Sequence, residues 1–211
     1  PIRFRSSSKK SIVKVLVMVV SKGSSVIRAF FAITVSNSVL EHCQRISRHL
    51  RELKMDGRFL RSESIHLTLN FLGNIDSEVV SEVVEILKST ACETASFDLQ
   101  FKGVGVFPYL TRPRIVWLGI EKCEVLCEMQ AKIESRLQQM GFLHNKRSFH
   151  PHLTLVRVKS RKNLSKLVRY VQTVGLNERA GQIRVRDIHL YQSILKPQGA
   201  KYRKLQTAEL S

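Results

Sequence analysis

The tetrapeptide His-Leu-Thr-Leu occurs at residues 66–69 and again at residues 152–155. Each copy lies in a run of apolar and β-branched residues that predicts a strand. Successive side chains of a strand point to opposite faces, so each copy presents its histidine and threonine on one face and its leucines on the other. We therefore expect the leucines to anchor a hydrophobic core and the two histidine–threonine pairs to face a shared cleft.

The sequence around the two copies follows the same order of elements. The first series has predicted strands at 26–35, 64–73 and 97–107 and predicted helices at 38–53 and 76–90. The second series has strands at 114–120 and 149–158, helices at 121–140 and 164–174, and extended runs at 182–195 and 200–209 joined by a turn at 196–199. Strand–helix–strand–helix–strand occurs twice, which predicts an α+β fold of two similar lobes, with each motif following a helix of its own lobe. Without a low-complexity linker, residues 26–211 are expected to form one unit.

The charge balance points to an anionic partner. Lys and Arg number 35 against 17 Asp and Glu, and the formal net charge is +18. Such a surplus favours RNA, DNA or anionic lipid without choosing among them, and a generally basic proteome would also explain it. The hydrophobic content of 43% is ordinary for a globular protein and argues against disorder along the whole length.

Residues 1–25 are expected to be a basic and apolar extension outside the catalytic fold. Their apolar run at 12–20 is too short to span a bilayer as a helix and contains Lys14, which favours neither a signal peptide nor an anchor. Membrane attachment or export is the minor alternative. The four cysteines lack zinc-site spacing and indicate free thiols in a reducing compartment, so we expect a cytoplasmic protein.

Two histidines facing one cleft suit phosphodiester cleavage without a metal. A neutral imidazole can take a proton from water while an imidazolium protonates the departing oxygen. Threonine hydroxyls can hold the non-bridging phosphate oxygens. Two alternatives stay open: each histidine packs at a strand end, or His150 and His152, which share a face, bind a metal although no Asp or Glu lies within either motif.

At these residues the chain resembles the 2H phosphoesterase superfamily, which is named for paired His-x-Thr motifs. More closely it resembles the RNA 2′,3′-cyclic phosphodiesterases, also called the 2′-5′ RNA ligase or LigT-like family. The flanking runs that carry this likeness are RAFFAI at 28–33, NFLG at 70–73, GVFP at 105–108, RPRIVWLG at 112–119, FHPHLTLVR at 149–157 and LYQS at 190–193.

The resemblance implies a bilobal fold in which two pseudo-twofold-related lobes place antiparallel sheets around a central cleft. It implies hydrolysis of RNA 2′,3′-cyclic phosphate ends to 2′-phosphomonoesters with no metal or other cofactor, and reversible 2′-5′ RNA ligation as a side activity. By position, His66 is the implied proton donor and His152 the proton acceptor. Thr68, Thr154 and Arg157 are the implied phosphate ligands.

One of these assignments, that of Arg157, meets a difficulty in the sequence itself. Simple alternation turns Arg157 away from the His152 face, so its role requires a bulge or a strand end. Phe71 is placed for contact with a nucleobase, and core packing is an equal alternative.

Rival functions remain for a chain with this pattern. A non-catalytic module of the same fold would bind a nucleotide or RNA without turnover, and another 2H activity would act on a different phosphodiester. A basic RNA scaffold would tolerate alanine at both histidines. We expect a monomeric enzyme that acts on RNA or an oligonucleotide with a 2′,3′-cyclic phosphate end and makes no stable membrane association.

Overall fold

The computed structural model describes residues 25–143, 148–197 and 199–211, so the predicted extension lies almost entirely outside it. Within these ranges the strands are β1 (Val26–Ile33), β2 (Gly57–Phe59), β3 (Leu67–Asp76), β4 (Phe97–Tyr109), β5 (Arg112–Ile120), β6 (His152–Val158), β7 (Arg179–Val185), β8 (Asp187–Ile194) and β9 (Lys201–Glu209). The α-helices are α1 (Asn37–Glu52), α2 (Val80–Cys92), α3 (Glu124–Gln139) and α4 (Leu164–Gln172), and short 3-10 turns cover Ser62–Ser64, Ser77–Val79 and Gly175–Asn177.

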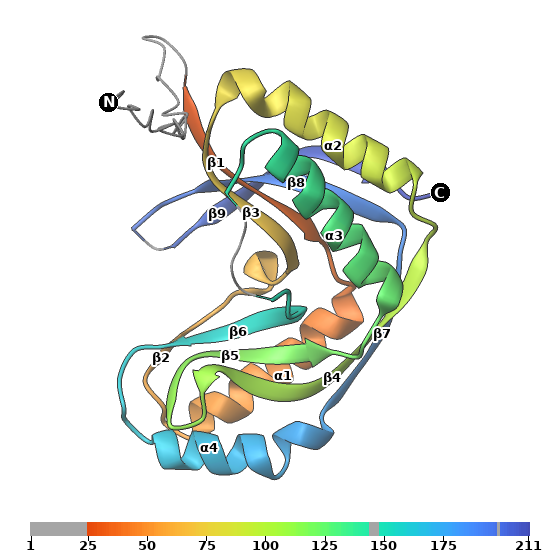
Figure 1. Ribbon diagram of the computed structural model, residues 1–211. Helices are drawn as coiled ribbons and strands as arrows, with labels where there is room; N and C mark the ends of the chain where they lie inside the picture. Colours follow the sequence, from red (N-terminus) through yellow and green to blue (C-terminus); the bar gives the residue numbers. More distant parts are fainter. Residues whose placement is uncertain (1–24, 144–147, 198) are drawn as a thin grey trace, which may run out of the picture.

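The strands form one curled antiparallel sheet in the order β7-β4-β5-β6-β3-β1-β8-β9, with β2 paired to β6 (Figure 1). Its two halves meet between β6 and β3, where Leu67 pairs with Leu153. We call β3, β1, β8 and β9 the first-motif half, and β7, β4, β5, β6 and β2 the second-motif half. The predicted bilobal α+β fold with a central cleft is confirmed, and the two tetrapeptides themselves form its junction.

The helices are exchanged between the halves. Helix α1 precedes the first motif but packs against β6 and β7, whereas α3 precedes the second motif and packs against β3 and α2. Helices α2 and α3 therefore cover the outer face of the first-motif half, and α1 and α4 cover that of the second-motif half (Figure 1). The expectation that each motif follows a helix of its own lobe is wrong. Both halves of the sheet have an apolar outer face, so the helix pattern alone does not determine which half a helix covers.

The extended run at 182–195 is also divided differently from the prediction. It consists of β7, which pairs with β4, and β8, which pairs with β1, and these partners lie in opposite halves. The chain crosses between the halves at Arg186, which belongs to neither strand. Strand β2 was not predicted, because three residues carry too little periodicity to be recognised.

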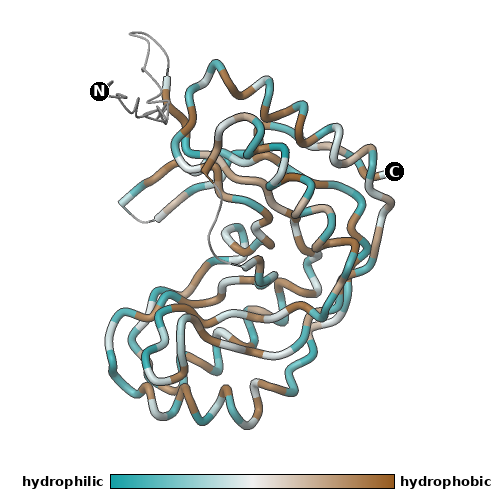
Figure 2. The backbone as a smooth tube through the Cα atoms, in the orientation of Figure 1, coloured by the Kyte–Doolittle hydropathy of each residue, from teal (hydrophilic) through white to brown (hydrophobic). Residues whose placement is uncertain are grey.

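The core has the predicted composition. The leucines of both motifs are buried: Leu67, Leu153 and Leu155 are 0% exposed and Leu69 is 4% exposed. The helices alternate hydrophobic and hydrophilic residues along their length (Figure 2), and α1 buries Val39, Cys43, Ile46 and Leu50 at helical spacing. Asp76 accepts a hydrogen bond from the Glu78 backbone N–H and so caps the 3-10 turn Ser77–Val79, which leads directly into α2.

Candidate active site

The Leu67–Leu153 pairing brings the two motifs together at the centre of the sheet. In antiparallel register it sets His66 beside Thr154 and Thr68 beside His152, so each histidine neighbours the threonine of the other motif. Because both leucines point into the core, the polar residues on either side of them face the cleft. One strand pairing thus assembles a nearly symmetric set of two imidazoles and two hydroxyls.

His152 begins β6 and is held by the segment just before it. Its Nδ1 lies 2.7 Å from the carbonyl oxygen of His150, which accepts the Nδ1–H. This bond leaves Nε2 of the neutral ring as a proton acceptor that faces the cleft. Burial lowers the pKa of His152, and the charges of His150 and Arg157 lower it further against the opposing effect of the His150 hydrogen bond.

His66 lies just before β3 among aromatic rings of the first-motif half. Its ring stacks on Phe30 with centroids 4.8 Å apart, and Tyr202 meets it edge-on at 4.9 Å. Burial lowers the pKa of His66 from 6.5 to about 4, with smaller contributions from the charges of Arg157 and His152 and an opposing hydrogen bond to the Ser64 backbone. His66 is therefore neutral at pH 7.

Arg157 reaches the cleft face through a bulge in β6. Trp117 of β5 pairs with Thr154, Val116 with Val156, and Ile115 with Arg157, so two steps on β5 match three on β6. The extra residue, Leu155, reverses the alternation and puts Arg157 on the side of Thr154. The bulge that the implied phosphate role requires is present, and the Arg157 charge acts on both histidines.

Phe71 occupies the matching position in the first-motif half. Ala32 of β1 pairs with Thr68 and Phe30 pairs with Phe71, which is again two steps against three. The side chain of Phe71 is 67% exposed and its ring lies 5.7 Å from Phe30. The core-packing alternative for Phe71 is therefore wrong, and the residue lies on the cleft face opposite Arg157 in the pseudo-twofold arrangement.

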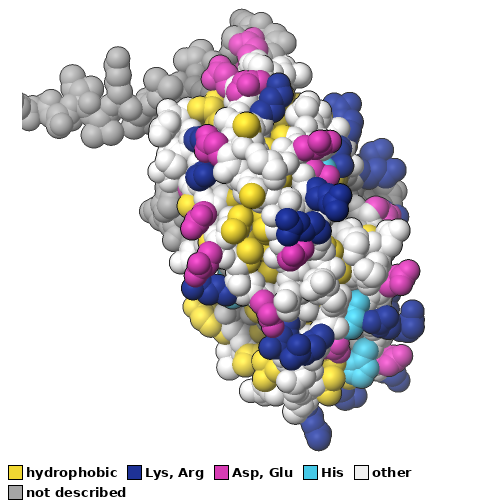
Figure 3. Space-filling model, turned by 90° about the vertical axis from the view of Figure 1, so that its right-hand side faces the viewer, with side chains coloured by type: hydrophobic (Ala, Val, Ile, Leu, Met, Phe, Trp, Pro, Cys, Tyr) yellow, Lys and Arg dark blue, Asp and Glu magenta, His cyan; other side chains and the backbone are white. Residues whose placement is uncertain are grey.

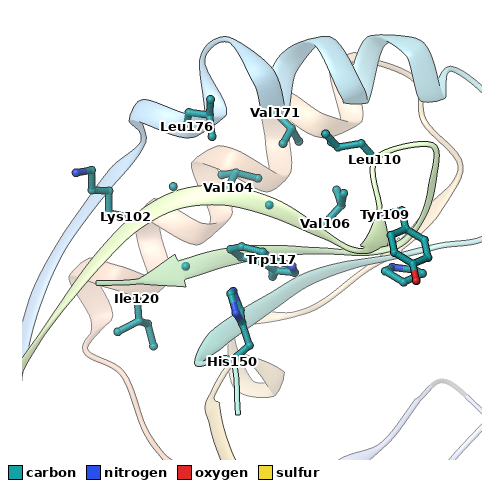
Figure 4. Close-up of a pocket in the computed structure, with 14 residues that line it drawn as sticks. Lys102, Val104, Val106, Tyr109, Leu110, Trp117, Ile120, His150, Val171 and Leu176 are labelled. Atoms are coloured by element: carbon teal, nitrogen blue, oxygen red, sulfur yellow. The ribbon is translucent and has the colours of Figure 1, made fainter. Parts of the chain in front are cut away.

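The second-motif half carries an aromatic floor beside His152. Trp117 is paired with Gly105, and a Cβ on Gly105 would overlap the indole, so the ring lies flat over the strand. Phe107 and His150 are each 5.1 Å from the Trp117 ring. Trp117 and His150 also line a pocket of about 440 Å³ together with Val171 and Leu176. Figure 4 shows Val171 and Leu176 on the far side of β4 from His150.

The part of the chain that contains both motifs matches a known protein family. A profile described as the 2′-5′ RNA ligase superfamily matches residues 39–195, which include both motifs and the bulge at Leu155. The chain belongs to the 2′-5′ RNA ligase superfamily.

Curated proteins of this superfamily cover most of the chain. The RNA 2′,3′-cyclic phosphodiesterase of Methanothermobacter thermautotrophicus is 30% identical over 184 residues, 87% of this chain and 99% of the relative. Its Aeropyrum pernix counterpart is 38% identical over 147 residues, 69% of this chain and 82% of the relative. The Aquifex aeolicus protein of the same name is 34% identical over 181 residues, 84% and 94% of the two chains.

Solved structures share the fold. A Thermus thermophilus protein superposes with a TM-score of 0.75 at 22% identity, covering 87% of this chain and 98% of its own. The apo form of E. coli LigT gives a TM-score of 0.71 at 24% identity, covering 89% and 99%. At this level of identity the likeness establishes the superfamily fold alone.

The sequence pattern identified the polar residues of the site but not its aromatic residues. His66, His152, Thr68, Thr154, Arg157 and Phe71 all border the cleft. The rings that surround the histidines were not singled out: Phe30, Phe107, Trp117, Tyr191 and Tyr202. The sequence feature that could have indicated these rings is Gly105 together with Trp117, because a glycine inside a strand often accommodates a large side chain from a neighbouring strand.

Proposed function

We propose that this chain hydrolyses the 2′,3′-cyclic phosphate ends of RNA to 2′-phosphomonoesters. The observation that carries the proposal is the Leu67–Leu153 junction, which gathers both His-x-Thr motifs at one place in the cleft. The names of curated relatives at 30–38% identity support the same activity. A net charge of +18 suits a polyanionic substrate.

In this mechanism His152 is the proton acceptor. Because Nδ1 donates to the His150 carbonyl, Nε2 has the free lone pair that takes a proton from water. The activated water attacks phosphorus, and the bond between phosphorus and the 3′ oxygen breaks. Thr68, Thr154 and Arg157 hold the non-bridging oxygens as charge develops on them.

His66 is the proton donor to the leaving 3′ oxygen, which departs as a 3′-hydroxyl. Each proton transfer contributes roughly 10²- to 10⁴-fold to the rate. His66 must be protonated to act, although burial lowers its pKa to about 4. A phosphate bound beside the ring brings negative charge and opposes that lowering. When the 5′-hydroxyl of a second RNA takes the place of water, the same groups join the two RNAs through a 2′-5′ linkage and release the 3′-hydroxyl, which is a reversible side activity.

Phe71 is assigned as the residue on which the nucleobase of the terminal nucleotide stacks. An exposed aromatic ring at the cleft face offers a stacking surface to any base. The mechanism needs no metal, because both proton transfers and the phosphate contacts come from side chains.

A non-catalytic nucleotide- or RNA-binding module is the second candidate. The low pKa of His66 favours it, since a neutral His66 binds a phosphate without donating a proton. A measurement of substrate turnover distinguishes the hydrolase from the non-catalytic module.

We place the protein in the cytoplasm as a monomer. The cysteines Cys43, Cys92, Cys123 and Cys127 are free thiols, as expected in a reducing compartment. No helix in the described ranges is long and apolar enough to cross a membrane.

The deciding experiment is hydrolysis of a short RNA with a 2′,3′-cyclic phosphate end in the presence of EDTA. We expect a 2′-phosphate product from the wild type and a loss of at least about 100-fold in both His66→Ala and His152→Ala. His49→Ala is the matched control, because His49 lies on α1 outside the cleft. No turnover by the wild type, combined with tight nucleotide binding, would establish the non-catalytic module instead.

A further inference from the structure

Strand β2 places a second arginine beside Arg157. Arg58 of β2 pairs directly with Arg157 of β6, and Phe59 pairs with Val156. Directly opposed residues of an antiparallel pair project from the same face, with Cβ atoms ~4.5–5.5 Å apart. Since Arg157 lies on the cleft face, Arg58 does too.

Two contacts of neighbouring side chains support this orientation. The Arg51 guanidinium of α1 lies 4.3 Å from the centre of the Phe59 ring, so Phe59 faces the helix layer and Arg58 the opposite side. A side chain on Gly199 would collide with the Arg58 guanidinium. Gly199 belongs to the turn before β9, in the first-motif half. Arg58 therefore reaches from one half of the sheet towards the other, along the border of the cleft.

Like charges directly opposite one another destabilise a strand pair. On the face that Figure 3 shows, acidic and basic side chains are interspersed. Acidic residues are frequent in α2 and α3, as at Glu82, Glu85, Glu128 and Glu134. The Arg58–Arg157 pair concentrates positive charge at the place where the proposed reaction holds an anion.

We propose that Arg58 binds the phosphate on the 5′ side of the terminal nucleotide, while Arg157 binds the reacting cyclic phosphate. This assignment rests on the proposed function. The two arginines are adjacent on one face, and the two phosphates are adjacent along an RNA strand. Arg58 then lets the enzyme distinguish the end of an RNA chain from a free nucleoside 2′,3′-cyclic phosphate, which carries no 5′-phosphate.

The test compares adenosine 2′,3′-cyclic phosphate with and without a 5′-phosphate. We expect the wild type to prefer the 5′-phosphorylated form by about tenfold in kcat/KM, as one exposed charge-assisted contact allows. Arg58→Gln should remove this preference and leave hydrolysis of the unphosphorylated form within about twofold of wild type. With an oligonucleotide substrate, Arg58→Gln should also reduce the slope of log(kcat/KM) against log[salt] by about 0.7.

Lys166→Gln is the matched control, since it removes one exposed positive charge on α4, on the outer side of the same half. An equal loss in Lys166→Gln would show an effect of net charge and overturn the assignment. An Arg58→Gln variant that keeps the preference, or that loses activity on both substrates equally, would also overturn it.

A separate readout keeps this inference independent of turnover. Failure of the wild type to hydrolyse either substrate would reject the proposed hydrolase alone. Calorimetric binding of adenosine 2′-monophosphate and adenosine 2′,5′-bisphosphate then tests Arg58. Tighter binding of the bisphosphate that Arg58→Gln abolishes would support the second phosphate site, and equal affinities in the wild type would reject it.

Discussion

Thr154 and Arg157 lie on the same face of β6, although three positions separate them along the strand. Their partners on β5 are Trp117 and Ile115, which are two positions apart and therefore share a face. The bulge at Leu155 absorbs the extra residue while the Leu155 side chain stays buried in the core. A threonine hydroxyl and a guanidinium are thereby directed at one place beside His152.

Arg157→Gln should lower kcat/KM for a cyclic phosphate end by roughly 10- to 100-fold, because a charge-assisted contact to phosphate is worth about 1.5–3 kcal/mol. The measurement is steady-state hydrolysis at low salt. Lys166→Gln serves as the control for net charge. A loss of less than threefold in Arg157→Gln would show that the guanidinium does not contact the reacting phosphate.

The pH dependence of hydrolysis should be shifted to the acidic side. In the proposed mechanism His66 acts as the protonated form and His152 as the neutral form, and the pKa of each is lowered in the folded protein. The fraction of protonated His66 rises as pH falls from 7 towards 4, so kcat/KM should rise until His152 also becomes protonated. We expect a maximum below pH 6.5. Arg157→Gln removes a charge that lowers both pKa values, so the maximum of kcat/KM for this variant should lie at higher pH. A wild-type maximum above pH 7 would contradict the assignment of the two histidines.

The rings around His66 should control its titration. Tyr202→Ala opens one side of the imidazole to water, which stabilises the charged form and raises the pKa of His66 towards 6.5. NMR titration of the histidine ring protons measures this directly. The pKa of His152 should stay unchanged in the same sample, and Tyr109→Ala, which alters a residue that is 70% exposed, should change neither.

Gly105 and Trp117 should be energetically coupled. Gly105→Ala places a methyl group against the indole, and we expect it to lower the free energy of unfolding by about 1–3 kcal/mol. In a Trp117→Ala background the same change should cost little, because the methyl then has space. Urea unfolding of the four proteins of this cycle gives the coupling energy, and additive effects would show that the two side chains do not compete.

Phe71→Ala should weaken nucleotide binding without destabilising the fold. Stacking of one base on an aromatic ring is worth about 1–3 kcal/mol, so KM should rise by about fivefold or more. The unfolding free energy should change by less than about 0.5 kcal/mol, since the side chain is 67% exposed. Phe71→Trp should restore affinity, and an unaltered KM in Phe71→Ala would place the base elsewhere.

The sequence by itself determined the local structure and identified the polar residues of the candidate site. Alternation in the two tetrapeptides fixed which residues are buried and which face the cleft, because the side-chain period of a strand is two. Helical spacing identified α1 to α4 within a few residues. The repeated His-x-Thr pattern was sufficient to select the two histidines, because their chemistry depends on residue type and on the face they occupy.

Only the tertiary structure decided how these pieces combine. The exchange of α1 and α3 between the halves, the crossing at Arg186 and the junction at Leu67 and Leu153 depend on pairings between distant segments. The bulge at Leu155 likewise depends on the register against β5, and it alone turns Arg157 to the cleft. Local patterns cannot contain this information, because an apolar helix face or strand face fits many partners, and the choice among them follows from packing the whole chain at once.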